Sequence, residues 1–309
     1  PIDPRGAAGL HADIARLVAL DAKSGATSAL PAVREAVRRI PELSDAPGRL
    51  CGQDGDRLAA LAELGEVIGW ILFDAGFYRA AHRMNTRALA LAELCGDLWT
   101  ARFVLLNDSM LQTHVGAPDT ALRAAARARG TRALPARVAG LVRIRQAHAI
   151  ALLGGHRDAL DLMSRARCLF LEGVSRRDPP WAWWIDRTEL LGHQGWVHAR
   201  LHQWDKAIDL LHEAVAAPGP SYRTLFAAKL LAVLARAGAW REAEDLIAGL
   251  APGAARIGSV RTTQTLERTA SGLLGRSGTP RPLREAAVFL RECLPAPHPL
   301  TPRQPPARP

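Results

Sequence analysis

Tryptophan is the residue type in this chain best suited to holding a ligand, and the tryptophans gather in one segment. Five of the eight, at positions 181, 183, 184, 196 and 204, fall within 24 residues. An indole offers a large contact area and one N–H donor, so this cluster suits the wall of a groove that binds a peptide or an apolar ligand. Packing between helices is the other interpretation. We favour packing for Trp204, at a predicted turn, and leave both open for Trp184 and Trp196.

Three histidines stand beside these tryptophans. His198 and His202 are four residues apart, a spacing that places two imidazoles on one helix face and suits a metal ion. No His-Glu-x-x-His arrangement is present, and no cysteine lies near enough to complete a site. We therefore expect no metal, and we place His193 and its neighbours on a surface or in a groove.

Paired carboxylates are the next candidates for chemistry. Asp186 and Glu189 are three residues apart on a predicted helix, and such a pair could serve as general acid and base. Ion pairs with the many arginines are the simpler interpretation, with Arg187, Arg145 and Arg102 as partners. Other carboxylates on predicted helices of the same kind are Glu63, Glu66 and Asp74.

Enzyme motifs are missing from the chain. It holds no phosphate-binding Gly-x-x-x-x-Gly-Lys-Ser/Thr loop and no Gly-x-Ser-x-Gly turn. The four cysteines are far apart and form no Cys-x-x-Cys pair, as in a protein with reduced thiols. No apolar run approaches the ~20 residues that span a bilayer. The sequence therefore predicts a cytoplasmic protein that is not an enzyme, carries no cofactor and does not enter a membrane.

The elements that position these side chains are predicted to be helices in tandem pairs. Strand patterns are almost absent, and glycines and prolines divide the chain into helical stretches. Five segments share one turn-and-helix pattern, whose aligned alanines are 40, 38, 48 and 36 residues apart. This spacing predicts an all-α, right-handed α-solenoid of about five tetratricopeptide-like hairpins, in which the first helix of each pair lines a concave groove. The aligned residues are Ala81, Ala121, Ala159, Ala207 and Ala243.

Three regions follow from this pattern. Residues 1–47 carry two predicted linker helices, and residues 48–293 form the repeat domain. Residues 294–309 contain seven prolines, which exclude a helix and predict a disordered tail.

The charge is strongly positive, yet it says little about nucleic acid. The chain has a formal net charge of +10, and only three of its 40 basic residues are lysine. A preference for arginine is typical of a high-GC genome. Residues 123–145 hold seven arginines without interleaved aromatic residues, so we expect a solvated face there instead of base stacking.

Two motifs carry a resemblance to a known family. The segments Glu66–Gly76 and Pro179–Asp186, the latter followed by Glu189–Gly195, resemble the C-terminal region of actinobacterial transcriptional regulators. Those proteins join an Xre-type helix-turn-helix domain to tetratricopeptide repeats. Residues 1–47 contain no counterpart of the DNA-binding head, so the resemblance implies contact with DNA only through an N-terminal domain missing from this sequence.

Together these patterns predict a regulatory sensor or protein-interaction module. Its concave groove would bind a peptide, a small signal molecule or a partner helix, and binding could alter a homodimer arrangement. The alternative is a free-standing scaffold that binds an acidic protein through its arginine-rich faces. The side chains predicted to line the groove are Trp70, Asp74, Asn107, His148, Trp184, Glu189, His193 and Trp196.

Overall fold

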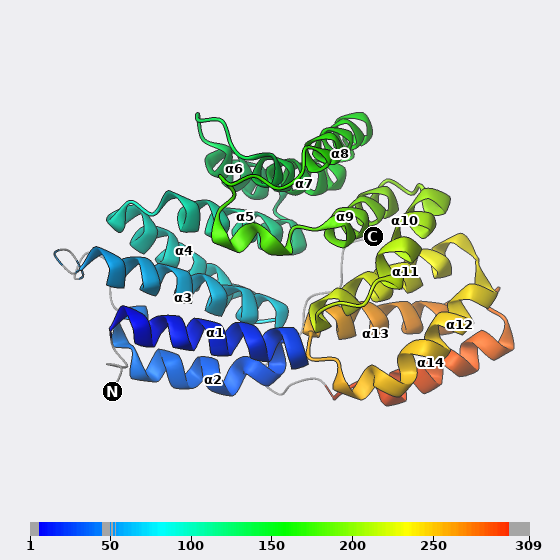
Figure 1. The fold of residues 1–309 in the computed structure, drawn as a ribbon. Coiled ribbons are helices and arrows are strands. Elements are labelled where there is room, and N and C mark those ends of the chain that lie inside the picture. Colours follow the sequence, from blue (N-terminus) through cyan, green and yellow to red (C-terminus); the bar gives the residue numbers. More distant parts are fainter. Residues whose placement is uncertain (1–5, 45–49, 51, 53, 297–309) are drawn as a thin grey trace.

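The chain is an array of helical hairpins. The computed structural model describes residues 6–44, 50, 52 and 54–296, and all regular structure in these residues is helical (Figure 1). In the described residues, fourteen α-helices pack as consecutive pairs, and each pair contacts the next pair along the chain. The predicted all-α solenoid is confirmed. The pairs are α1 (Ala7–Ser24) with α2 (Ala26–Arg39), α3 (Gly55–Asp74) with α4 (Tyr78–Cys95), α5 (Leu98–His114) with α6 (Pro118–Arg129), α7 (Ala136–Leu152) with α8 (His156–Leu171), α9 (Arg187–Arg200) with α10 (Trp204–Ala216), α11 (Thr224–Ala237) with α12 (Trp240–Leu250), and α13 (Val260–Gly275) with α14 (Arg281–Cys293).

Small residues set the spacing inside each pair. The five aligned alanines of the repeat pattern are all fully buried. A Cβ on Gly69 of α3 would lie 2.1 Å from Oδ1 of Asn85 on α4, and a Cβ on Gly195 of α9 would lie 2.6 Å from Cγ of Leu211 on α10. Only a glycine at these two places lets the paired helices approach this closely.

The first hairpin belongs to the array. Helices α1 and α2 share one hydrophobic core with α3, in which Leu10, Leu17 and Leu61 are almost fully buried. The segment predicted as linker helices is thus packed as the first repeat-like pair, and α13 with α14 adds a pair beyond the five predicted. Most of the predicted tail, residues 297–309, lies outside the described residues.

The array curves until its beginning meets its end. In Figure 1, α1 lies beside α13, although the two helices are more than 200 residues apart in the sequence. The amide N–H of Thr27 donates to the carbonyl oxygen of Gly258 at 2.9 Å, and the hydroxyl of Ser221 donates to the carbonyl oxygen of Asp21 at 2.8 Å. Gly25 permits the contact, because its φ is +82° and a Cβ there would lie 2.7 Å from the backbone of Gly258. The curved array therefore encloses a cavity.

Candidate functional site

The cavity lies on the inner side of the array and has a volume of about 490 Å³. Its α-helical lining comes from α1, α3, α5, α7, α9, α11 and α13, which are the first helices of the pairs, as the repeat pattern predicts. Two short 3₁₀ helices complete the lining, η3 (Pro180–Trp184) and η4 (Ser221–Arg223). Because every pair contributes, an occupant would touch the whole array at once.

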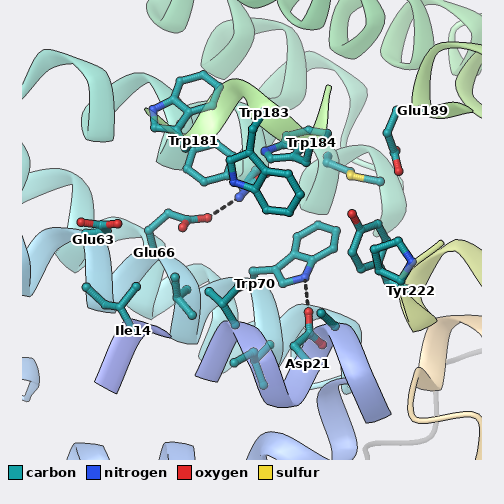
Figure 2. A pocket seen from close by; sticks show the side chains of 18 of the residues that line it. Ile14, Asp21, Glu63, Glu66, Trp70, Trp181, Trp183, Trp184, Glu189 and Tyr222 are labelled. Atoms are coloured by element: carbon teal, nitrogen blue, oxygen red, sulfur yellow. Dashed lines mark hydrogen bonds between the residues drawn. The ribbon is translucent and has the colours of Figure 1, made fainter. Parts of the chain in front are cut away.

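One wall of the cavity is aromatic and comes from η3. Trp181 stacks on Phe103 of α5, with ring centroids 4.5 Å apart and planes only 6° from parallel. Trp183 is 66% exposed at the edge of the cavity, and Figure 2 shows the indoles of Trp183 and Trp184 across the cavity from Trp70. An apolar ligand would find wide indole faces here.

Trp184 therefore reaches the cavity by a different route from the one predicted. The sequence suggested that Trp184 lies on the first helix of its pair, but α9 begins only at Arg187. Asp186 precedes the helix as its N-cap, and its Oδ1 accepts a hydrogen bond from the amide of Glu189 at 3.0 Å. The backbone leaves the helical region at Ile185 and Asp186, and this break separates η3 from α9.

The floor of the cavity is Trp70 of α3. Its indole N–H donates to Oδ2 of Asp21 on α1 at 3.2 Å. Its ring meets Tyr222 of η4 edge-on, with centroids 6.5 Å apart, and the guanidinium of Arg261 lies 5.1 Å from its centroid. Trp70 thus joins α1 to the later hairpins.

Asp21 is a buried carboxyl beside this indole. Burial raises its pKa to about 7, and the charge of Asp74 raises it further, while the Trp70 hydrogen bond and Arg261 oppose the rise. The residue is only 6% exposed, and its buried Oδ1 has no hydrogen-bond partner within the part of the chain that the structure describes. The free oxygen belongs to a residue that lines the cavity.

Glu66 is a second buried carboxyl, one helical turn before Trp70. Asn107 of α5 donates its amide N–H to Oε1 of Glu66. Burial raises the pKa of Glu66 to about 8; the Asn107 hydrogen bond lowers it and the charge of Glu63 raises it. At neutral pH Glu66 is therefore mainly protonated.

The carboxylates on the far side of the cavity are paired. Arg223 of η4 contacts Glu189 at 3.1 Å and Asp186 at 2.7 Å. Burial raises the pKa of Glu189 to about 7, and the Arg223 charge opposes the rise. Pairing with arginine is confirmed for Asp186, Glu189 and Asp74, but not for Glu63, which lies near His11, or for Glu66, which contacts Asn107. The three arginines named as partners reach other groups. Arg187 pairs with Glu213, Arg145 donates to the carbonyl of Leu106, and Arg102 donates to the carbonyl of Ala128.

A buried histidine pair supports the cavity from behind. Nε2 of His148 lies 2.9 Å from Nδ1 of His193, and both rings pack against Trp196. Burial lowers the pKa of both histidines well below the ordinary value, so both are neutral at pH 7. Trp196 is 7% exposed and also faces Lys229, whose ammonium lies 4.5 Å from the ring centroid. It packs in the core and lines the cavity at the same time.

Six of the eight predicted groove residues line the cavity. Asp74 does not, because it is fully buried and accepts hydrogen bonds from Ser259 at 2.9 Å and Arg261 at 2.7 Å. His148 lies behind His193 and lines a much smaller pocket instead. The six are Trp70, Asn107, Trp184, Glu189, His193 and Trp196.

Other lining residues escaped the sequence prediction. Glu66 lies four residues before Trp70, so a shared helix face could have revealed it. Asp21 and Tyr222 offered no such signal, because α1 and η4 reach the cavity only through the closure of the array.

The spacing of His198 and His202 does not form a metal site. Helix α9 ends at Arg200, and His202 follows it with φ of 58°. Nδ1 of His198 lies 2.6 Å from Oε1 of Gln203 instead. Within residues 6–44 and 54–296, no three His, Cys, Asp or Glu side chains are grouped to hold a metal ion. In the same part of the chain, no helix combines the length and apolarity that crossing a membrane requires.

Comparison with known proteins supports the fold. No protein-family model matches the chain, and no curated protein shows significant sequence similarity. Among solved structures, the chain is similar to a Rap protein in complex with competence and sporulation factor, with a TM-score of 0.50 and 11% identity. The similarity covers 93% of this chain and 88% of the Rap chain. At this identity the likeness shows a shared helical-repeat architecture.

Proposed function

We propose that this chain is the sensor module of a transcriptional regulator, and that it binds a peptide or small signal in the cavity on the inner side of the array. The observation that carries the proposal is the cavity itself, which has a volume of about 490 Å³ and lining residues from every hairpin. Its aromatic rings come from α3, α5, α9, α11, η3 and η4. Sites for small ligands are typically concave, largely apolar and equipped with a few polar groups. The Rap protein to which the chain is similar binds a signalling factor in its solved complex, which favours the same use of the fold here.

The closure of the array supplies a route from binding to regulation. Each hairpin packs mainly on its neighbours, so small rotations add along the array. An occupant that touches α1, α9 and α13 together would favour one curvature over another. Such a ligand shifts the equilibrium only by the difference in its affinity for the two shapes.

The output of the sensor follows from the family resemblance. The motifs at 66–76 and 179–195 resemble regulators that carry a separate helix-turn-helix domain, and such a domain would make the contact with DNA. A change in curvature would then alter the arrangement of those domains in a homodimer. Arginine faces of the repeats take no part in this route.

Selection of peptides on the purified protein tests the proposal. A displayed library of random heptapeptides is selected on the protein, and binding of the recovered peptides is measured by tryptophan fluorescence. Trp184→Ala and Asn107→Ala should each weaken binding by about tenfold or more, since each removes a group that lines the cavity. Trp240→Ala is the matched control, because Trp240 is half-buried on α12 and outside the cavity. Peptides that bind both cavity variants as tightly as the original chain would refute the proposal.

A scaffold that binds an acidic protein remains the second candidate. The observation behind it is a row of exposed arginines on and after α6, at positions 123, 127, 129 and 132. Binding through these arginines should weaken steeply as salt rises, whereas binding in the aromatic cavity should respond little. Replacing all four with glutamine would abolish scaffold binding and leave cavity binding intact.

A further inference from the structure

We infer that the cavity is built for a ligand that presents a positively charged nitrogen, an ammonium or guanidinium group on an apolar body, to Glu66, Asp21 and Trp70. The inference rests on the proposed function, since it names the chemical class that this cavity would accept.

The first argument is that Glu66 and Asp21, the two buried cavity carboxyls outside the Arg223 pair, have no positively charged hydrogen-bond partner among the described residues; the more exposed Glu63 lies 3.8 Å from His11. Glu189 is paired with Arg223, and Asp97 is engaged as the N-cap of α5. Within the described residues, Glu66 has only the amide of Asn107 as a hydrogen-bond partner, and Asp21 has only the indole of Trp70. Buried carboxyl groups are normally paired or fully hydrogen-bonded. Oδ1 of Asp21 has no donor among the described residues and is itself buried, so a ligand donor would reach it only when the neighbouring side chains shift.

The second argument is the position of these carboxyls around an aromatic ring. Glu66 and Trp70 are four residues apart and share a face of α3, while Asp21 reaches the same indole from α1. Figure 2 shows Glu66 and Asp21 on different sides of Trp70, with Trp183 and Trp184 across the cavity from it. Aromatic faces attract cations, and aromatic cages recognise alkylated ammonium groups. Carboxyls and indoles therefore favour the same kind of ligand.

The two arginines that line the cavity make their hydrogen bonds to groups other than Glu66, and Nη1 of Arg261 is buried without a partner among the described residues. Arg261 lies over Trp70 but contacts Asp74 at 2.7 Å. Arg145 donates to the carbonyl oxygen of Leu106 at 3.1 Å and lies near His193. Neither arginine neutralises Glu66. A cationic ligand would supply the charge that Glu66 lacks and would add to the effect of Arg261 on Asp21.

Binding of a cation should release protons. Glu66 faces Glu63 on its own helix and Asn107 from α5, while Asp21 faces Trp70 and Asp74 from α3 and Arg261 from α13. With pKa values raised to about 8 and about 7, these carboxyls are largely protonated near pH 6. A nearby positive charge favours the ionised form. Affinity for a cation should therefore rise with pH up to about pH 8, and a neutral ligand should show no such rise.

Three probes of matched shape test the inference: phenethylamine, which is cationic, phenethyl alcohol, which is neutral, and 3-phenylpropionate, which is anionic. Binding is followed by tryptophan fluorescence and by calorimetry at about pH 6 and about pH 8. We expect the amine to bind about tenfold more tightly than the alcohol at the higher pH, with proton release. A short blocked peptide with one lysine, compared with its acetyl-lysine form, tells whether the cation is better accepted from a peptide side chain than from a small amine.

Substitutions assign the effect to the two carboxyls. Glu66→Gln and Asp21→Asn should each reduce amine affinity and its pH dependence, and leave binding of the alcohol unchanged. Glu93→Gln is the control, because Glu93 is exposed on α4 and pairs with Arg127. Failure of the amine to bind, equal binding of the alcohol or of the anion, or unchanged amine affinity in both carboxyl variants would overturn the inference. Peptides that still depend on Trp184 and Asn107 would leave the proposed function standing in that case.

Discussion

Replacing Glu66 with glutamine should make the protein more stable at alkaline pH. In the unfolded chain this carboxyl has its ordinary pKa of 4.5, whereas burial in the folded chain raises the pKa to about 8. Between these values the folded protein holds a proton that the unfolded chain has lost. Raising the pH through this window therefore favours unfolding. Glutamine keeps an acceptor for Asn107 but does not titrate, so the variant lacks this loss.

The size of the effect follows from the same two pKa values. Within the window each pH unit costs about 1.4 kcal/mol in the free energy of unfolding. From pH 4.5 to pH 8 the accumulated cost is about 4 kcal/mol, and above pH 8 it levels off. This is a large fraction of the stability of an ordinary domain.

Urea unfolding followed by tryptophan fluorescence measures the effect. The wild-type chain and Glu66→Gln are unfolded at half-unit steps between about pH 5 and about pH 8.5. The difference between the two profiles isolates Glu66, because Asp21, Glu189 and Lys229 titrate in both proteins. Glu93→Gln should give a profile parallel to the wild type. A constant difference between wild type and Glu66→Gln across this range would show that the carboxyl is not held protonated by burial.

Three substitutions test the packing that shapes the cavity. Arg261→Met leaves Asp74 as a carboxylate without a cationic partner and with 1% of its side chain exposed. We expect the free energy of unfolding in urea to fall by about 3–5 kcal/mol and to recover largely when Asp74→Leu is added. A fall below about 1 kcal/mol would contradict the pairing of Arg261 with Asp74. Gly192→Ala places a methyl group 2.3 Å from the ring of Phe226 and should cost about 1–3 kcal/mol in thermal unfolding, whereas exposed Gly249→Ala should cost nothing. Gly258→Ala places a methyl group 2.1 Å from the carbonyl oxygen of Ser24 in the first hairpin. Amide hydrogen exchange should therefore accelerate in α1 and α2 but not in α7. Unchanged exchange in α1 and α2 would argue against the contact between the first and last hairpins.

The local pattern of the chain predicted most of the fold. Helix pairing depends on small residues at fixed spacing, and those residues, such as Ala81 and Ala207, are fully buried where the pattern places them. Gly76 has φ of 84° and forms the turn after α3, as its place in the repeat predicts. These features are properties of neighbouring residues, so a sequence displays them directly.

The lining of the cavity was predictable only in part. Trp70 and Asn107 lie on first helices, and the repeat pattern alone places them inside. Asp74 lies on the same helix, but its partner Arg261 is 187 residues away, and no local pattern announces that pair. The sequence could not show that the array closes on itself. This closure determines which buried carboxyls form ion pairs with arginines from distant hairpins, as Asp74 does with Arg261.

The contact between Gly25 and Gly258 turns an open solenoid into a closed one. An open solenoid has two free ends, and its terminal repeats can fray without disturbing the middle. Here the first and last hairpins contact each other, so each stabilises the other against fraying. Loss of any one hairpin would break this contact and destabilise the whole array. The circumference is fixed by the number of hairpins, and inserting or deleting one would leave the two ends unable to meet.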